Sequence, residues 1–457
     1  MDRFDIKLII SSIKSVLIRL ICVICVLLEW EKIKERKFII LLIFPLFLGA
    51  RCGEEPPPPQ PPKPTHKTKL SIVWHIPFHS DSIDYYFIDP MLVQDYLILP
   101  NMFGRNSDHK PGVGVFHKQT GKRHSAWLAE PGGILDNNDM LEDCKLGGTN
   151  DNIIFINSGS SLYAFDLNSK QRLWKSARPQ GWDGWSRFSM VAENPFLVYD
   201  LGYSKTKFVK FDTQSGAKKD ILELLSENGY WVSVRPPGWH IMGNGDTLLF
   251  FGTSEWNFNI GRGKIRAFCY NLTQKKMVWE KRDFCDDTDG GLYPSIVTDE
   301  QNAIICGMRS IHCFNIATGE LLWQHDMFKN GYLIDAFSDT PPLYNEGKVY
   351  LRGGTGNLYC YDAVTGAELW VNKLGAIPAP HGRMDIYDGY LYFTGWRGTG
   401  AIGLYCVSAS TGQMKWFDTG PNGRISFGVI ADQKTGYLYC HSGIFVMCVD
   451  LRKTPVN

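Results

Sequence analysis

Ten residues of this chain indicate its fold most clearly: Tyr361-Asp362-Ala363-Val364-Thr365-Gly366-Ala367-Glu368-Leu369-Trp370. The tyrosine ends a short, aromatic and roughly alternating run that begins at Gly356, which is typical of a β-strand. The Asp362 side chain can accept hydrogen bonds from the backbone that follows it, and Gly366 supplies the positive φ of a turn. Trp370 lies in the next strand, and its indole is large enough to fill the gap between two sheets. The stretch therefore predicts a hairpin that packs one blade against another.

The same pattern recurs along the chain: an aromatic or small apolar residue, then Asp, Asn or Ser, with Gly or Lys four residues and Trp eight residues after the polar one. It is repeated in Phe165-Asp166 to Trp174, Tyr270-Asn271 to Trp279, Phe314-Asn315 to Trp323 and Val407-Ser408 to Trp416. Tryptophans of neighbouring units lie about 44 to 47 residues apart, which is the period of four-stranded propeller blades. Lys170 and Lys275 replace the glycine in two units, where we expect some backbone strain.

Two further units are irregular. Phe116-His117 reaches Gly121 at the expected offset, but Trp127 comes two residues late. The unit from Phe211 to Gly216 continues to Ile221-Leu222 without a tryptophan. Because each unit keeps its turn, both still count as blades.

The two ends of the repeat complete each other. The last unit, from Tyr437 to Asp450, stops before an outer strand, whereas Leu70 to Trp74 has the pattern of an outer strand with no unit before it. Pairing the two completes a blade and closes the ring, which removes the strand edges of an open array. One turn marks each blade, at residues 117, 166, 212, 271, 315, 362, 408 and 450. We therefore predict an all-β, eight-bladed propeller of four-stranded blades.

The repeated motif resembles the tryptophan-docking repeat of quinoprotein (PQQ-type) propellers, over about residues 68 to 457. The resemblance implies a structural docking role for Trp74, Trp127, Trp174, Trp279, Trp323, Trp370 and Trp416. It is less specific for function, because the repeat is shared by quinone-dependent dehydrogenases and by cofactor-free scaffolds such as the BamB lipoprotein of outer-membrane assembly.

The residues before the propeller indicate export. The stretch Lys32 to Lys37 is basic, Phe38 to Ala50 is an apolar run and Cys52 follows, so residues 32–52 resemble a bacterial lipoprotein signal peptide with Cys52 as the lipidation site. Arg51 departs from that pattern, since a small residue normally precedes the cysteine. An ordinary exported or membrane-anchored protein is the alternative.

Two other segments flank this signal. Residues 1–31 form an upstream extension with a second apolar stretch, for which a start codon assigned too far upstream is the plainest interpretation, and a cytoplasmic extension or membrane hairpin the alternative. Residues 53–67 form a proline-rich linker, which predicts an extended tether to the propeller of residues 68–457. We expect a chain that is lipid-anchored to the outer membrane of a bacterial cell envelope, facing either the periplasm or the surface.

Composition and cysteine placement agree with a folded domain. The net charge is +1, with 44% hydrophobic and 13% aromatic residues, which gives no reason to expect a nucleic-acid partner. Five of the 12 cysteines, two residues before the polar turn residue, are predicted to be buried free thiols: Cys269, Cys313, Cys360, Cys406 and Cys448. Equivalent positions in stacked sheets lie about 10 Å apart, too far for a disulfide. The state of Cys144, Cys285, Cys306 and Cys440 is left open.

Catalytic chemistry is weakly indicated. The resemblance to quinone-dependent dehydrogenases implies PQQ with calcium, but the disulfide between adjacent cysteines of the alcohol-oxidising members is impossible here because no two cysteines are adjacent. The acidic loops at 285–291 and 136–143 are interpreted as solvated turns, because an EF-hand register would put Cys285 where an aspartate is required. No catalytic, cofactor-binding or metal-binding residue is predicted.

Polar and aromatic residues near the start of several innermost strands are the candidate binding site. They are expected to line one mouth of the central channel: Arg187, Arg235, Trp239, His240, Arg383 and Arg424. Guanidinium forks beside aromatic rings can hold a carboxylate, a sugar or a peptide. The alternative is that the arginines bond loop carbonyls and join the blades.

Three classes of function follow. The first is a membrane-tethered, non-catalytic scaffold that binds other envelope proteins, with the outer-membrane barrel-assembly machinery as one candidate partner. The second is a PQQ-dependent oxidoreductase, and the third a carbohydrate- or peptide-binding surface lipoprotein. In each case we expect a monomeric propeller.

Overall fold

A computed structural model describes the propeller from Leu70 to Val456, with gaps. The residues outside the description are 1–69, 78–89, 101–111, 129–152, 158–160, 178–185, 193, 202–203, 228, 283, 285–294, 299–300, 308, 330–331, 334, 336–339, 379–381, 398–399, 422, 443–444 and 457. Cys52, the signal peptide, the linker and both acidic loops therefore lie wholly or largely outside the described residues.

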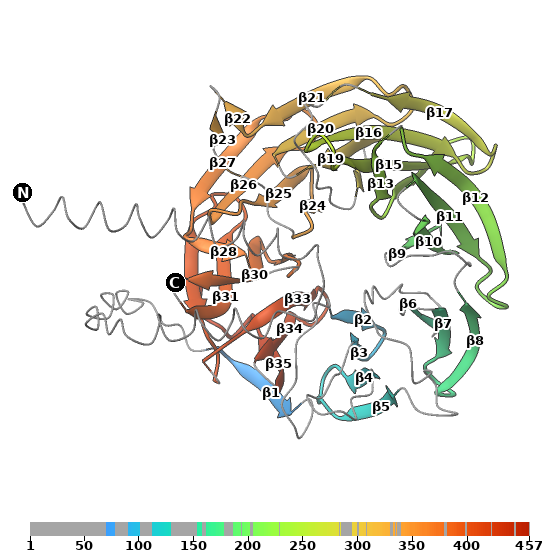
Figure 1. The fold of residues 1–457 in the computed structure, drawn as a ribbon. Coiled ribbons are helices and arrows are strands. Elements are labelled where there is room, and N and C mark those ends of the chain that lie inside the picture. The colour runs from blue at the N-terminus through green and yellow to red at the C-terminus, as the bar shows by residue number, and fades with distance from the viewer. Residues whose placement is uncertain are drawn as a thin grey trace, which may run out of the picture. The chain divides into compact units, whose positions relative to one another are not determined.

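Antiparallel sheets follow one another around a ring, as predicted (Figure 1). Blade 1 holds β2 (Met91–Val93), β3 (Tyr96–Pro100), β4 (Gly112–His117) and β5 (Arg123–Leu128). Blade 2 holds β6 (Ile153–Asn157), β7 (Ser161–Asp166) and β8 (Gln171–Ala177). Blade 3 holds β9 (Ser186–Val191), β10 (Asn194–Leu201), β11 (Lys205–Phe211) and β12 (Lys218–Leu225). Blade 4 holds β13 (Trp231–Val234), β14 (Gly238–Ile241), β15 (Thr247–Asn257), β16 (Arg262–Asn271) and β17 (Lys276–Lys281).

The second half of the ring continues in the same way. Blade 5 holds β18 (Ile296–Val297), β19 (Asn302–Cys306), β20 (Ser310–Asn315) and β21 (Leu321–Asp326), and is followed by the hairpin of β22 (Phe328–Lys329) and β23 (Tyr332–Leu333). Blade 6 holds β24 (Leu343–Asn345), β25 (Lys348–Arg352), β26 (Asn357–Asp362) and β27 (Glu368–Lys373). Blade 7 holds β28 (Ala376–Pro378), β29 (Asp385–Tyr387), β30 (Tyr390–Arg397), β31 (Ala401–Ser408) and β32 (Met414–Asp418).

Blade 8 joins the first described strand to the last. It holds β33 (Ser426–Asp432), β34 (Tyr437–Ser442), β35 (Phe445–Asp450) and β1 (Ile72–Pro77). β1 pairs with β35 in antiparallel fashion, with Trp74 opposite Cys448. The outer strand predicted at Leu70 to Trp74 thus begins two residues later and runs further, because its pairing is set by the length of β35. The described residues contain no helix long and apolar enough to cross a membrane.

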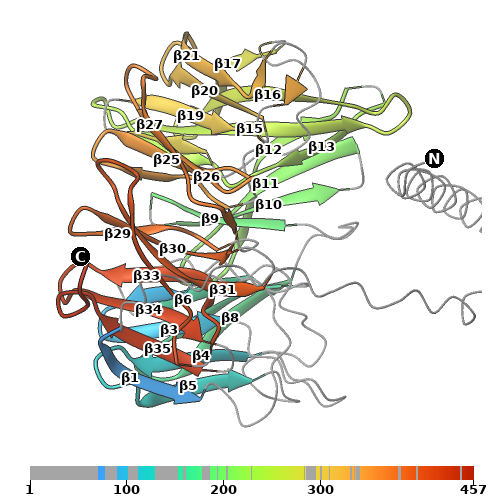
Figure 2. The same cartoon turned by 90° about the vertical axis from the view of Figure 1, so that its left-hand side faces the viewer.

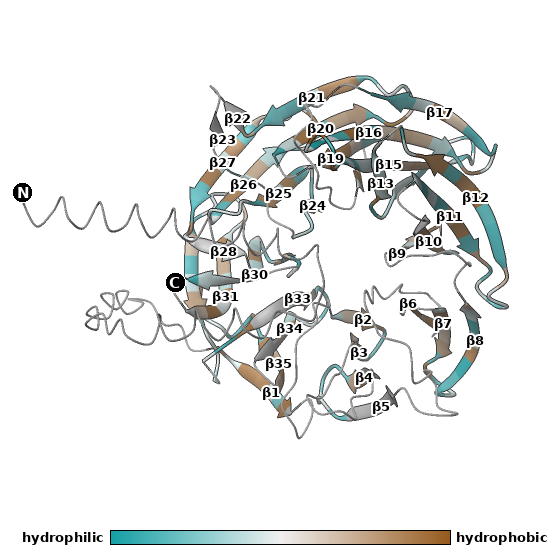
Figure 3. Cartoon of the chain, viewed as in Figure 1, coloured by the Kyte–Doolittle hydropathy of each residue, from teal (hydrophilic) through white to brown (hydrophobic). Residues whose placement is uncertain are grey.

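The hydrophobic core lies between neighbouring blades. Ile304 and Cys306 of blade 5 pack with Val349, Leu351 and Tyr359 of blade 6 in one buried cluster, and comparable clusters occur around the ring. Burial falls from the middle strands to the outer ones: β7 is almost wholly buried whereas β8 is mostly exposed. Figure 3 shows hydrophilic residues along the outer strands. The ring is thus held by apolar surface that each blade cannot bury alone.

A tryptophan on the outer strand joins each regular blade to the next. Trp323 Nε1 donates to the carbonyl of Ala363 at 3.1 Å, and the ring lies against Gly366, where a β-carbon would be 2.6 Å from Cδ2. The same donation joins Trp74 to Lys118, Trp174 to Thr213, Trp279 to Ile316 and Trp370 to Ala409. Trp416 is buried, but its Nε1 has no hydrogen-bond partner. The Trp127 side chain lies outside the described residues.

Comparison with the two turns that have lysine in place of glycine shows why the turns of other blades use glycine. Lys170 and Lys275 both have positive φ, 59° and 56°. Each turn follows an irregular unit: the tryptophan before Lys170 is displaced along the sequence, and the unit before Lys275 has none. Where an indole lies on the turn, a β-carbon would collide with it. Contact with the tryptophan of the preceding blade, more than the positive φ of the turn, therefore makes glycine obligatory in these turns.

Seven cysteines are described, and all are buried free thiols. This confirms the prediction for the five that precede the turns and settles Cys306 and Cys440 in the same way. Burial raises the pKa of each thiol, to about 12 for Cys269. Cys144 and Cys285 lie outside the described residues.

Candidate functional site: an aromatic tip on blade 4

The predicted mouth residues are spread over several blades. Arg235, Trp239 and His240 belong to blade 4, where Trp239 and His240 lie within the inner strand β14 rather than before it. Arg383 and Arg424 each lie two residues before an innermost strand, β29 in blade 7 and β33 in blade 8. Trp239 is 37% exposed, and the three arginines just named are half-buried. The Arg187 side chain lies outside the described residues.

Arg383 lies beside a contact that joins two blades. Asp385 is buried and accepts hydrogen bonds from the backbone N–H of Ile386 at 2.9 Å and of Ala431, in blade 8, at 2.8 Å. Burial raises the pKa of Asp385, and the nearby Arg383 guanidinium opposes that rise. For Arg383 this geometry favours the blade-joining alternative over a free binding site.

A different set of residues forms an exposed apolar surface. β13 pairs with the far half of β15, with Trp231 opposite Trp256. The chain then turns through residues 258–261 into β16, and this hairpin projects beyond the neighbouring blades (Figure 2). Trp231 is 39% exposed, Phe258 59% and Ile260 57%. We call Trp231, Trp256, Phe258 and Ile260 the aromatic tip.

The rings of the aromatic tip are packed together. The centroids of Trp231 and Phe258 lie 4.2 Å apart, and those of Trp256 and Phe258 lie 6.3 Å apart in an edge-on arrangement. Gly263 lies under the Trp256 ring, where a β-carbon would be 2.8 Å from Cε3. The tip therefore presents a preformed aromatic surface.

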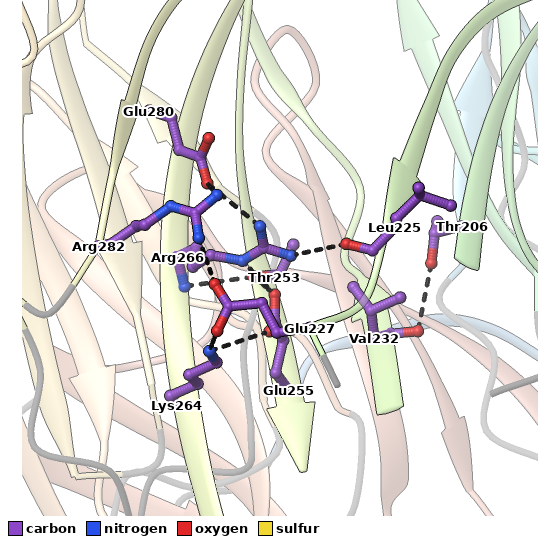
Figure 4. Close-up of polar contacts among 10 residues, drawn as sticks. All are labelled: Thr206, Leu225, Glu227, Val232, Thr253, Glu255, Lys264, Arg266, Glu280 and Arg282. Carbon is purple, nitrogen blue, oxygen red and sulfur yellow. Dashed lines mark hydrogen bonds and ion pairs between the residues drawn. The ribbon is translucent and has the colours of Figure 1, made fainter. Parts of the chain in front are cut away.

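A network of charged side chains supports this surface (Figure 4). Arg266 of β16 is buried, and its guanidinium donates to Glu255, to Glu280 at 3.1 Å and to the carbonyl of Leu225 at 3.1 Å. Glu280 also pairs with Arg282 at 2.6 Å. These contacts tie β15, β16 and β17 to the end of β12 in blade 3.

The same network fixes the loop that leads to Trp231. Glu227 in that loop pairs with Lys264 and Arg282, and the Lys264 ammonium lies 4.4 Å from the centre of the Tyr230 ring. The hydrogen bond from Lys264 holds the pKa of Glu227 below its usual value. Burial raises the pKa of Glu255 despite Arg266. Ordered partners of this kind reduce the entropy that a binding surface loses on association.

Sequence reasoning missed the aromatic tip. Trp256, Phe258 and Ile260 alternate with polar residues, which is a strand pattern, and such a pattern does not show that its apolar face is exposed. The sequence signal that could have revealed the tip is the long interval between the turns of blades 3 and 4. The interval from the end of the blade 3 turn to the start of the blade 4 turn holds two strands of 11 and 10 residues, β15 and β16.

The described residues hold no cluster of acidic, histidine or cysteine side chains that could ligate a metal ion. Among them, no three His, Cys, Asp or Glu side chains come together as a metal-binding group. Calcium requires several oxygen ligands at one place.

Comparison of sequences finds a matching family and a distant relative. The family described as outer membrane protein assembly factor BamB matches residues 307–447. Tetrathionate hydrolase of Acidithiobacillus ferrooxidans is 22% identical over 335 residues, which cover 66% of this chain and 63% of that enzyme. The chain therefore matches less than two thirds of this curated relative. The aromatic tip lies outside the stretch that the family matches.

Solved structures show the same fold. BamB from Moraxella catarrhalis superimposes with a TM-score of 0.52 at 12% identity, over 85% of this chain and 99% of that one. Quinohemoprotein alcohol dehydrogenase from Comamonas testosteroni gives 0.59 at 11% identity, over 84% of this chain and 77% of that one. The eight-bladed fold and the resemblance to PQQ-type propellers are confirmed. At these identities the likeness carries no function.

Proposed function

We propose that this protein is a non-catalytic propeller scaffold of the bacterial cell envelope, tethered to the outer membrane through Cys52, that binds another envelope protein. The match to the BamB family over residues 307–447 supports the scaffold class. The aromatic tip is the observation that carries the proposal, because it supplies a surface for a partner.

The tip has the composition of a protein-binding hot spot. Tryptophan and arginine are enriched at such sites, and clustered aromatic anchors there contribute most of the affinity. Trp231 and Phe258 supply the anchors, and the half-exposed guanidinium of Arg282 pairs with Glu227, in the loop that leads to Trp231. Exposed apolar side chains gathered on one projection mark an interaction surface more often than scattered ones.

Affinity purification after crosslinking tests the proposal. The tagged full-length protein is recovered from detergent-solubilised envelopes, and co-purifying proteins are identified by mass spectrometry. We expect the double variant Trp231→Ser with Phe258→Ser to lower partner recovery by about tenfold or more. Recovery of barrel-assembly proteins would assign the scaffold to that machinery.

The matched control replaces two exposed leucines on other blades. Leu173 of β8 and Leu369 of β27 are 44% and 45% exposed on outer strands of blades 2 and 6. The double variant Leu173→Ser with Leu369→Ser is expected to recover the partner as well as the wild type does. Equal loss in both double variants would show that the tip has no special role.

A PQQ-dependent oxidoreductase is the alternative. It is compatible with the repeated motif, which quinone-dependent dehydrogenases share with cofactor-free scaffolds. Adding PQQ and calcium chloride to the purified protein distinguishes the two. Saturable binding, read as a change in the absorption of PQQ, would overturn the non-catalytic proposal.

A further inference from the structure

The interface between blade 8 and blade 1 is built differently from the others. The described strands of blades 1 to 7 are consecutive in the chain, whereas blade 8 takes its outermost strand, β1, from the other end. Two contacts secure the start of β1: the N–H of Asp450 donates to the carbonyl of Ser71 at 2.8 Å, and the N–H of Ser71 donates to Thr454 Oγ1 at 3.1 Å. We call this interface the closing seam. Because the chain passes through it only by way of β1, the two blades can separate if β1 leaves β35.

A buried ion pair lies across the closing seam. Lys118, in the turn between β4 and β5, is 9% exposed, and Asp432, at the end of the innermost strand β33, is 6% exposed. The Lys118 ammonium lies 3.0 Å from Asp432 Oδ2. The Lys118 carbonyl also accepts the hydrogen bond of the Trp74 indole from β1. Lys118 of blade 1 therefore contacts both the innermost and the outermost strand of blade 8.

Other interfaces of the ring have apolar side chains at the same two places. Between blades 1 and 2, Val93 at the end of β2 shares a buried cluster with Leu167, which follows its turn residue as Lys118 does. Between blades 3 and 4, Val191 at the end of β9 shares one with Leu272. The residues at the Lys118 position of the other blades are all uncharged: Leu167, Thr213, Leu272, Ile316, Ala363, Ala409 and Leu451. Among the eight turns, the charged side chain thus occurs only where the ring closes.

The ion pair makes the closing seam weaker than apolar side chains would. Removing a carboxylate and an ammonium from water offsets most of their attraction, and apolar residues of similar volume often stabilise a protein more. The geometry is also imperfect, because Asp432 Oδ2, although close to the ammonium, accepts no hydrogen bond of normal geometry. What the pair provides is specificity, since either charge placed against an apolar blade would be buried without a partner.

We propose that the ring opens at the closing seam in preference to its other interfaces, and that the ion pair of Lys118 and Asp432 controls this opening. In the closed state the pair and the Trp74 indole align blade 1 on blade 8. In the open state β1 leaves β35, and Cys448, which lies opposite Trp74, becomes accessible to solvent. This opening is independent of the aromatic tip, which lies on blade 4.

Buried thiols report on the closing seam and on another interface separately. Cys448 packs with Trp74 and Leu97 in the cluster between blades 8 and 1. Cys360 has the equivalent position in blade 6 and packs with residues of blade 7. Both thiols are fully buried, and burial raises the pKa of each to about 12. A difference between their labelling rates therefore reports a difference in how often the two interfaces open.

Thiol labelling of the folded, full-length protein in detergent tests the proposal. The protein is exposed to a low concentration of N-ethylmaleimide at neutral pH, and the label at each cysteine is quantified over time by peptide mass spectrometry. We expect Cys448 to react about tenfold faster than Cys360, or more, because the seam lacks the apolar contacts of other interfaces. Equal rates would show that the closing seam opens no more readily than the interface of blades 6 and 7, and would overturn the proposal.

Variants of the ion pair separate its effect from that of β1. The double variant Lys118→Met with Asp432→Leu gives the seam apolar side chains, and should slow labelling of Cys448 about tenfold while leaving Cys360 unchanged. The single variant Lys118→Met leaves the Asp432 carboxylate buried without its partner, and should speed labelling of Cys448 instead. If the double variant labels Cys448 as fast as the wild type does, the pair does not control the opening. If the single variant speeds labelling of Cys360 equally, the pair supports the whole fold, and the proposal is again contradicted.

Discussion

At the residue scale, burial outweighs nearby charges in setting the pKa of several side chains, and His312 is one of them. His312 of β20 is buried against Phe284 and Phe314. Burial lowers its pKa from 6.5 to about 4, although Asp326 acts in the opposite direction. His312 is therefore neutral in the folded protein at neutral pH.

This shift predicts a pH dependence of stability. Because the pKa is lower in the folded state, the contribution of His312 is complete above about pH 6.5 and is lost as the pH falls towards 4. The loss amounts to at most about 3 kcal/mol. The variant His312→Gln should show a flatter free energy of unfolding between pH 7.5 and 4.5, measured by urea unfolding. A slope equal to that of the wild type would refute the assignment.

At the element scale, the turn between the two outer strands of a blade is the unit that specifies the fold. In the turn from Asp362 to Gly366, the aspartate accepts from the N–H of Val364 at 3.1 Å and of Thr365 at 2.7 Å. These were the interactions expected from the sequence. The added constraint is the indole of Trp323 from the preceding blade, which makes the turn part of an interface.

Two glycines with nearly the same φ allow the effect of the positive φ to be measured apart from that of the indole contact. Gly366 has φ +72° and lies on Trp323, whereas Gly389 has φ +75° and nothing within 4 Å of a β-carbon. Gly389→Ala should cost only the positive-φ term, about 1 to 2 kcal/mol. Gly366→Ala should cost that amount and about 1 to 3 kcal/mol more from the collision. Equal changes in unfolding midpoint would show that the indole imposes no constraint.

At the scale of the whole molecule, the sequence predicted the ring but not the aromatic tip that we propose as a binding surface. Eight turns and the tryptophan period determine the blades because each unit repeats the same local physics. The aromatic tip depends on the pairing of Trp231 with Trp256, and exposure of a strand face is a tertiary property.

Some predicted features lie outside the described residues, and they stay predictions. Lipidation at Cys52, the side chain of Arg187 and that of Trp127 belong to this group. The channel-mouth site also stays a prediction, and Arg383 lies beside a buried aspartate that joins blades 7 and 8. The binding surface that we propose, the aromatic tip, differs from that candidate site.

Site-specific photocrosslinking tests the central claim most directly. A benzophenone amino acid placed at Phe258 in the full-length protein, in intact envelopes, should form a light-dependent adduct with one envelope protein. The same amino acid at Leu369, which is 45% exposed on an outer strand against 59% for Phe258, should form none. Absence of an adduct at Phe258, or equal adducts at both positions, would contradict the account of a scaffold that binds through its aromatic tip.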